Sequence, residues 1–485
     1  MTIRRVFALL LFVQLFNIGL RETLDPDMWW HLRTGEFIWQ HGIPHHDVFS
    51  FTVLDHEWVT HEWLSEALMW PVYQIGGLPG LSVAFAALAA LAFWLVYKCS
   101  EGRPYLAGLV VILVSFAASP SFGVRPQIFD LVMTAVFVRQ LEAFTDCKLT
   151  RGLLSLPLLT IAWVNLHGGY LLGVVLLATY ALGGGLQRLF GNSADGTPAW
   201  SDVRWLAIVA ALCFGAALVN PNGWHLWAYP FGTLGSPVMQ QNIAEWRSPD
   251  FHQYAYWPFA VLVGLGVIGW LVAPGRPCCT DVLLFLGSAA AGLMSVRHIA
   301  VFGVVATPVI ARSLAKALRG TRTYVALTGQ SGPNLLSRRK AQLNWAILVA
   351  GALSAGVWDA AKLAKNDAAI AQAYPVAAVG FLDREGLAPR RGYNPYVWGG
   401  YLIWRRIPVF VDGRADVYGD EFLSYYLKTF RLTDDWRKPL EDFNVSYVLV
   451  ERSNPLGTLL TASGQWHEVY ADEVARVFRR SGDTT

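Results

Sequence analysis

The sequence predicts a polytopic α-helical membrane protein that carries a small α/β domain after its last membrane helix. Of its 485 residues, 54% are hydrophobic and only 15% are charged, and the mean hydropathy is +0.37. Soluble domains usually carry about 25% charged residues. Long apolar runs recur as far as residue 361, each near the roughly 20 residues that cross a bilayer. A mixed, charged segment follows them.

We expect eleven membrane spans, and the basic Arg4-Arg5 pair without a small-residue cleavage site favours an uncleaved first helix. The expected domains are a membrane domain at 1–361, with a large first loop at 21–78, and a C-terminal α/β domain at 362–485. The spans lie near 4–20, 79–98, 104–119, 127–144, 152–165, 170–188, 204–219, 255–273, 281–294, 299–316 and 344–361.

The charge pattern predicts the orientation of the chain. Lysine and arginine gather in alternate connections, above all between residues 312 and 340, which indicates a cytoplasmic N-terminus. An odd number of spans then leaves the first loop and the C-terminal domain outside the cytoplasm, in a multi-pass protein of the inner (plasma) membrane. Ten histidines fall in predicted outside segments, and the five cysteines fall inside or within spans, which agrees with an oxidising outer compartment.

Short apolar runs in the C-terminal domain predict strands at 409–411, 447–450 and 475–478. Its helices are expected at 376–384, 420–427 and 435–443. The motif at 411–420 joins an Asp-Gly-Arg turn at 412–414 to further acidic and aromatic residues, and it has two open interpretations. It is either a surface for a carbohydrate or a headgroup, or a structural turn that packs on the mouth of a cavity.

An acidic and aromatic motif, Asp25-Pro-Asp27-Met-Trp-Trp-His31, directly follows the first apolar segment. Ionised groups at a bilayer edge are costly and usually functional, and tryptophan favours the headgroup level. The motif therefore predicts a reactive site at the lipid–water boundary, with Asp27 as the general base that takes a proton from an acceptor. Asp25 is the second catalytic candidate, but Asp before Pro also suits a helix start, and we favour capping for it.

The first loop carries six of the eleven histidines and two candidate amphipathic helices, at 31–41 and 62–75. The segment 56–61 begins with His-Glu and ends with His, as in zinc proteases. Its two histidines are five residues apart, however, whereas a helix brings residues four apart onto one face. We therefore exclude that type of site. A divalent metal ion held by Asp27 with His31, or by the segment 45–47, is left open as a cofactor.

Polar residues of the other outside turns complete the predicted site, because the inside turns contain nothing comparable. Arg125 and Arg297 suit a phosphate, since a guanidinium fork matches phosphate oxygens; interfacial snorkelling is the alternative. Gly168 and Gly169 belong to the site or form a tight turn. We expect a single polar cavity whose substrate-binding residues are His31, Arg33, His61, Glu62, Arg125, His167, Glu245, Arg297 and His298.

The motifs at 25–35, 125–127, 165–169 and 398–414, in this order around many spans, resemble the GT-C superfamily of membrane glycosyltransferases. The similarity is greatest to bacterial members grouped with dolichyl-phosphate-mannose protein mannosyltransferases and with RgtA/B/C/D-like lipopolysaccharide-core enzymes. In that superfamily an acidic residue of the first loop acts as the base, which the resemblance assigns to Asp27 or Asp25. Asp-Pro-Asp stands where the mannosyltransferases have Asp-Glu.

The resemblance implies an enzyme that moves a sugar from a polyprenyl-phosphate-linked donor to an extracytoplasmic glycan, lipid or protein acceptor. Membrane lipid is the other expected partner, and nucleic acid is not expected. Arg125 or Arg297 would stabilise the leaving phosphate. The alternatives are a transporter or flippase of a lipid-linked glycan and a ligase-like transferase of a whole glycan. A transporter should contain charged or broken helices at mid-bilayer, and the spans contain almost none.

Overall fold

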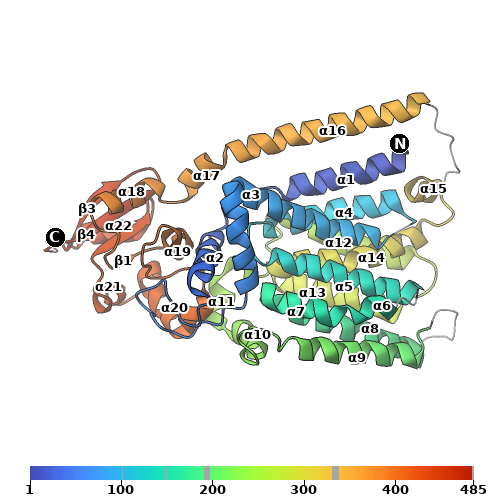
Figure 1. Ribbon diagram of the computed structural model, residues 1–485, viewed down its shortest axis with the longest axis horizontal. Helices are drawn as coiled ribbons and strands as arrows, with labels where there is room; N and C mark the ends of the chain where they lie inside the picture. Colours follow the sequence, from blue (N-terminus) through green and yellow to red (C-terminus); the bar gives the residue numbers. More distant parts are fainter. Residues whose placement is uncertain (101, 148–149, 191–196, 330–337, 483–485) are drawn as a thin grey trace.

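A bundle of nearly parallel helices forms one part of the molecule, and the C-terminal domain covers one end of it (Figure 1). The computed structural model describes residues 1–100, 102–147, 150–190, 197–329 and 338–482. The N-terminus lies at the end of the bundle far from the C-terminal domain (Figure 1).

Each of the eleven predicted spans coincides with a helix, which confirms the fold class. The eleven helices are α1 (Ile3–Gly19), α3 (Trp63–Lys98), α4 (Pro104–Ala118), α5 (Ile128–Cys147), α7 (Leu156–Leu166), α8 (Leu171–Phe190), α9 (Trp200–Ala216), α12 (Trp257–Val272), α13 (Cys279–Met294), α14 (Ile299–Ala317) and α16 (Arg338–Ala364). By length and composition, six of the described helices are long and apolar enough to cross a membrane, namely α3, α4, α8, α12, α14 and α16. The short helix α6 (Thr150–Leu154) precedes α7.

The bundle has a central helix and a peripheral one. Most of α14 is buried, whereas α16 contacts α1 and leaves Leu353, Val357 and Trp358 exposed. Figure 1 shows α16 along one edge of the bundle, leading to the C-terminal domain. Exposed apolar side chains on such a helix suit contact with lipid rather than with water.

The first loop folds into the two expected helices. The first is α2 (Met28–His41), and the second is the part of α3 at 63–76. A kink separates that part from the span at 78–98, because Gly77 has a left-handed φ of 60° that interrupts the helix. The helix α2 packs between α3 and the C-terminal helix α19 (Tyr396–Trp404), so its apolar face is covered by protein.

The C-terminal domain contains a four-stranded sheet in the order β1-β2-β4-β3. Strand β1 pairs in parallel with β2, and β4 pairs antiparallel with both β2 and β3. The strands are β1 (Gly392–Tyr393), β2 (Tyr447–Glu451), β3 (Trp466–Ala471) and β4 (Ala475–Arg480). The helices of this domain, besides α19, are α17 (Asn366–Ala373), α18 (Val376–Arg384), α20 (Ala415–Arg431), α21 (Lys438–Asp442) and α22 (Pro455–Ala462).

Most predicted elements of this domain are present, but one strand was assigned wrongly. The strands at 447–450 and 475–478 and the helix at 376–384 are confirmed, 420–427 lies inside α20, and 435–443 is reduced to α21. The segment 409–411 does not join the sheet. The Val409 N–H donates to the Phe49 carbonyl (3.2 Å), and the Phe51 N–H donates to the Val409 carbonyl (3.2 Å). It pairs with the first loop instead.

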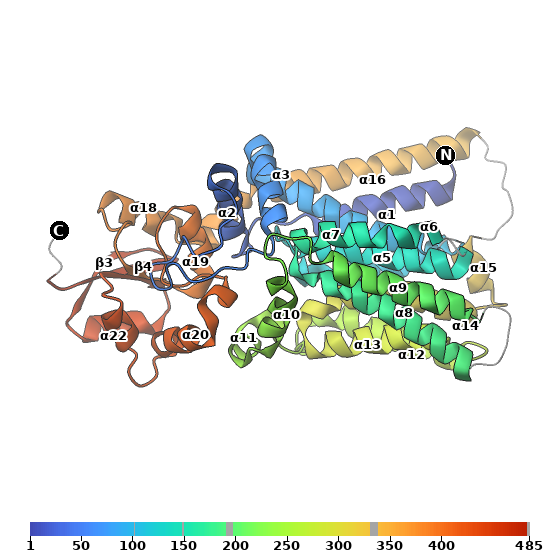
Figure 2. The same cartoon turned by 60° about the horizontal axis from the view of Figure 1, so that its bottom comes forward.

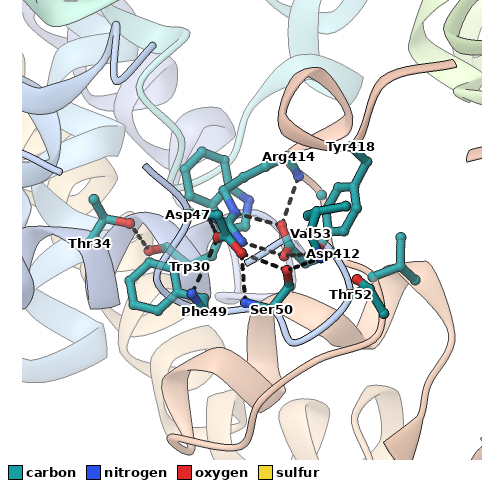
Figure 3. Close-up of polar contacts among 12 residues, drawn as sticks. Trp30, Thr34, Asp47, Phe49, Ser50, Thr52, Val53, Asp412, Arg414 and Tyr418 are labelled. Carbon is teal, nitrogen blue, oxygen red and sulfur yellow. Dashed lines mark hydrogen bonds and ion pairs between the residues drawn. The ribbon is translucent and has the colours of Figure 1, made fainter. Parts of the chain in front are cut away.

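A buried ion-pair cluster fastens the first loop to the C-terminal domain (Figure 3). The Arg414 guanidinium lies 2.6 Å from an Asp47 oxygen and 2.7 Å from Asp412 Oδ2, and all three side chains are fully buried. It also lies over the rings of Phe49 and Trp58, at 5.1 and 4.6 Å from their centres. Because a buried charge is costly without partners, this cluster requires both segments to stay together. The Asp-Gly-Arg turn is thus structural in part.

We expect Arg414→Ala to destabilise the protein by about 3–5 kcal/mol, since it leaves two buried carboxylates without their cation. Thermal unfolding in detergent measures the effect. The matched control is Arg406→Ala, which also breaks a pair between the domain and the first loop, to Glu36 at 2.9 Å. The Arg406 side chain is 66% exposed, so its loss should cost about 1 kcal/mol or less. Equal effects of the two changes would contradict the assignment.

Candidate active site

A polar cavity of about 430 Å³ lies where one end of the helix bundle meets the C-terminal domain. Residues of the first loop, of four further connections at the same end of the bundle and of the C-terminal domain contribute to its wall. Its titratable lining residues are Asp25, Asp27, His31, His61, Glu62, Arg125, His167, Tyr229, Glu245, Arg297, Tyr396, Arg414 and Asp416. Figure 2 shows α10 (His225–Gly235) and α11 (Pro237–Asn242) beside this junction.

Three carboxylates surround Arg125 at one side of the cavity. Arg125 Nη2 lies 2.9 Å from Asp27 Oδ2, its Nε lies 3.6 Å from Asp25 Oδ1, and its Nη1 pairs with Glu245. Trp30 Nε1 donates to the other Asp27 oxygen at 3.2 Å. The cation therefore orients the acidic motif, and its charge is already matched by protein carboxylates.

The pKa of Asp27 is raised to about 7. Burial is the largest cause, the neighbouring Asp25 and Glu245 add to it, and Arg125 opposes it. A carboxylate with such a pKa is poised to take up a proton near neutral pH. Asp25 accepts the backbone N–H of Asp27 at 3.0 Å, which closes the turn before α2, and burial also raises its pKa. The N-cap position of α2 is Asp27, so the capping role expected for Asp25 is wrong. Asp27 therefore lies in the cavity with a pKa near neutrality and with both oxygens held by protein groups.

A histidine–carboxylate network forms the opposite side of the cavity. Glu62 Oε1 lies 2.9 Å from His167 Nε2 and 3.2 Å from His61 Nε2, while Glu62 Oε2 lies 3.3 Å from His31 Nδ1. Burial alone would raise the pKa of Glu62, but the histidines, His61 first among them, hold it well below its usual value. Glu62 is therefore an ionised acceptor at the centre of the network.

His167 and His31 respond to burial in opposite ways. Burial lowers the pKa of His31 to about 3, which makes its imidazole neutral. Burial also acts against a charge on His167, but Asp130 and Glu62 raise its pKa to about 9. His167 Nδ1 lies 2.6 Å from Asp130 Oδ2, so the ring is held charged between two carboxylates.

The Gly168-Gly169 pair forms the 3₁₀ turn η2 (Gly168–Tyr170) and is required by this network. A Cβ atom on Gly169 would lie 2.3 Å from an Asp130 oxygen, and one on Gly168 would lie 3.2 Å from the His61 ring. The glycine turn is therefore part of the site, because Gly169 has no room for a side chain and Gly168 has little.

An apolar pocket of about 370 Å³ adjoins the polar cavity, and Arg297 lines both. The pocket runs between the first turns of α5, α8 and α14. Among the described residues no carboxylate lies within ion-pair distance of Arg297, whose guanidinium lies 5.2 Å from the centre of the Trp246 ring. Its apolar lining residues include Ile128, Leu131, Leu171, Leu172, Val175, Leu234, Ala300 and Val301.

The structure brings most of the predicted site residues together. Asp25, Asp27 and seven of the nine predicted substrate-binding residues line the polar cavity. The other two, Arg33 and His298, are not among its lining residues. Arg33 pairs with Glu36 on the same helix, and His298 lines the apolar pocket instead.

Sequence reasoning missed Asp130 and Tyr229, whereas Asp416 lies within the motif at 411–420, whose role the sequence left open. Asp130 falls inside the span predicted at 127–144, and an acidic residue in an apolar span is itself a signal of function. Asp416 enters the cavity from the C-terminal domain, beside Tyr229 and the His61 ring, whose centre lies 4.1 Å from that of Tyr229. No local pattern indicates that contact, because Asp416 and Tyr229 are more than 180 residues apart in the sequence.

One group of described residues has the geometry to hold a metal ion, and it differs from both predicted groups. His31, Glu62 and Glu66 each offer a ligand atom within 4.8 Å of the others, and one Glu66 oxygen has no hydrogen-bond partner. Nitrogen and carboxylate donors suit zinc or manganese. The segment 45–47 is otherwise engaged, since Asp47 accepts from the Ser50 N–H (2.9 Å) and pairs with Arg414.

The charged state of His167 gives a pH test of this network. Its pKa of about 9 exceeds the unfolded value of 6.5, so the stabilisation is complete below pH 6.5 and is lost as pH rises through 9. We expect the free energy of unfolding to fall by about 3 kcal/mol across that window. His167→Gln should remove this pH dependence in chemical denaturation, and the fully exposed His252→Gln should keep it. An unchanged slope in His167→Gln would contradict the network.

Comparison with known proteins identifies the fold. No protein-family model matches the chain, and no curated protein matches its sequence. The oligosaccharyltransferase AglB from Archaeoglobus fulgidus, solved with an inhibitory peptide and a dolichol-phosphate, superposes with a TM-score of 0.56 at 12% identity, over 92% of this chain and 69% of that chain.

A second solved structure matches over nearly the whole of both chains. ArnT from Cupriavidus metallidurans, bound to undecaprenyl phosphate, superposes with a TM-score of 0.53 at 12% identity, over 99% of this chain and 98% of that chain. At such identities the likeness is one of fold. AglB and ArnT are GT-C superfamily membrane glycosyltransferases. The chain has the fold of the GT-C superfamily.

Proposed function

We propose that this protein is a membrane glycosyltransferase that moves a sugar from a polyprenyl-phosphate carrier to an acceptor hydroxyl or amine outside the cytoplasm. The observation that carries the proposal is that the polar cavity and the apolar pocket adjoin each other. The polar cavity contains a carboxylate poised as a base, and the adjoining apolar pocket meets it at Arg297. A polyprenyl phosphate has the matching division into an apolar chain and an anionic head.

Arg297 is the better phosphate ligand of the two predicted arginines. Arg125 is already paired with Asp25, Asp27 and Glu245, so an anion beside it would meet three carboxylates. Arg297 has no such pair among the described residues and lies where the apolar pocket opens into the cavity. Its guanidinium would stabilise the phosphate that leaves the sugar.

The proposed reaction is a displacement at the anomeric carbon of the sugar. The acceptor oxygen or nitrogen forms the new bond to that carbon, and the bond between the carbon and the phosphate oxygen breaks. The proton of the acceptor passes to Asp27, and the electron pair leaves with the lipid phosphate next to Arg297. Arg125 and Trp30 hold the Asp27 carboxylate in position for this step.

The likeness to AglB and ArnT supports this proposal at the level of fold. One of these proteins was solved with a dolichol-phosphate and an inhibitory peptide and the other with undecaprenyl phosphate. We extend the lipid-phosphate donor to this chain, with a glycan, lipid or protein as acceptor. In the orientation that the charge pattern predicts, the cavity and the C-terminal domain lie on the outer side of the inner membrane. A whole glycan is an alternative cargo for the same chemistry.

We expect Asp27→Asn to lower sugar transfer by about 10²–10⁴-fold, because an amide cannot take up the acceptor proton. Transfer from undecaprenyl-phosphate-linked sugars in membranes measures the effect. Asp25→Asn is the matched control, since Asn caps a turn about as well as Asp, and it should keep most activity. Transfer by the unchanged protein should rise with pH through about 7 as Asp27 ionises. Full transfer by Asp27→Asn, or lipid binding without any transfer, would favour the transporter alternative.

We expect Arg297→Gln to weaken binding of undecaprenyl phosphate by about tenfold or more, because a charge-assisted hydrogen bond contributes roughly 1.5–3 kcal/mol. Titration of the purified protein with that lipid, followed by native mass spectrometry, measures the effect. Arg247→Gln is the control in the same outside region, since Arg247 is exposed and donates to the Gln241 carbonyl. Equal affinities of the two variants would argue against Arg297 as the phosphate ligand.

A further inference from the structure

We propose that the Asp412-Gly413-Arg414 turn of the C-terminal domain positions the Asp27 carboxylate, which makes this domain a working part of the active site. The inference rests on the proposed function, because it assigns the turn a role toward the proposed base. Asp27 and the turn are almost 390 residues apart in the sequence, and they meet at the wall of the polar cavity.

The contact between the turn and the base is close. A Cβ atom on Gly413 would lie 1.9 Å from Asp27 Oδ1 and 3.0 Å from Trp30 Nε1. The backbone of Gly413 therefore packs directly against the carboxylate and against the indole that donates to it. Gly400 approaches the same motif, since a Cβ atom there would lie 2.3 Å from the Pro26 carbonyl oxygen. Only a residue without a side chain permits either approach.

The turn is held rigidly in this place. Arg414 donates from Nε and Nη2 to the two Asp412 oxygens at 2.8 and 2.7 Å, and the Tyr418 hydroxyl donates to Asp412 Oδ2 at 2.6 Å. The Tyr396 hydroxyl donates to the Gly413 carbonyl at 2.9 Å. Figure 3 shows Arg414 between Asp412 and Asp47 of the first loop.

The first loop and the turn of the C-terminal domain are thus joined around Asp27. Asp47 and Trp30 belong to the first loop, as Asp27 does, and Arg414 ties that loop to the turn. A shift of the turn would therefore move Gly413 against Asp27 or away from it. Misplacement of a catalytic group by about 1 Å can lower a rate on the order of 100-fold, so the rigidity of the turn has a functional consequence.

The test is Gly413→Ala in the full chain, with Gly356→Ala in α16 as the matched control. Gly356 is exposed and has no atom within 4 Å of an added Cβ. The readout is modification of Asp27 by dicyclohexylcarbodiimide, which reacts with a protonated buried carboxyl group, followed by peptide mass spectrometry across a pH series. Neither a donor nor an acceptor is needed, so failure here is separate from failure of the proposed function.

The unchanged protein and Gly356→Ala should lose modification of Asp27 as pH rises through about 7. In Gly413→Ala the displaced carboxylate loses the Trp30 hydrogen bond, so the midpoint should move upward by about one unit, with undecaprenyl phosphate binding retained. The kcat of transfer should fall by about 10–100-fold with little change in KM for the donor. A midpoint equal to that of Gly356→Ala would overturn the proposal.

A second pair of variants decides the matter if Gly413→Ala does not fold. Tyr418→Phe removes the hydroxyl that holds Asp412. Tyr425→Phe removes an exposed hydroxyl of the same helix, α20, that donates to Asp442 of α21. We expect the Asp27 midpoint to move upward in Tyr418→Phe and to stay unchanged in Tyr425→Phe. If both variants keep the midpoint of the unchanged protein, the turn does not position Asp27.

Discussion

The Arg414 cluster is the interaction on which the rest of the structure depends. Removing a guanidinium and two carboxylates from water costs several kcal/mol per ion, and only good geometry repays it. Here the cation reaches Asp412 through two bonds, reaches Asp47 of the first loop and lies over two aromatic rings. Because the polar cavity is built from both segments that this cluster joins, the pairing helps to hold the walls of the cavity together.

The two arginines of the site look alike in sequence and differ in structure. Both precede apolar helices at the same membrane face, and both suit a phosphate by residue type. Three carboxylates neutralise Arg125, so it serves to hold the acidic motif. Arg297 stacks on Trp246 and faces both the cavity and the apolar pocket. The number of carboxylates around a cation, which no sequence pattern reveals, separates an internal partner from a ligand-binding group.

Whether a feature can be predicted from the sequence depends on how far apart in the chain the interacting residues lie. The apolar runs define eleven helices because hydropathy is a local property. The acidic motif is equally local, so Asp27 could be singled out. The pairing of 409–411 with the first loop spans about 360 residues, and period-2 patterns cannot distinguish it from a strand within the domain's own sheet. Asp130 was overlooked because its neighbours suggest a membrane span. Its partners are Trp163 of α7 and His167 directly after that helix, which are more than 30 residues away in the sequence.

Burial acts on every ionisable group of the cavity, and the partners decide the outcome. His31 lacks a sufficient opposing charge and becomes neutral, while His167 between Asp130 and Glu62 stays charged. Asp27 is intermediate, because Arg125 offsets only part of the effect of burial and of the nearby carboxylates. If Arg125 offset burial and the nearby carboxylates completely, the pKa of Asp27 would be low and the carboxylate too weak a base. If Arg125 offset none of them, Asp27 would remain protonated. The crowding of three carboxylates around one arginine thus has a chemical reason, since it keeps the pKa of Asp27 near neutrality.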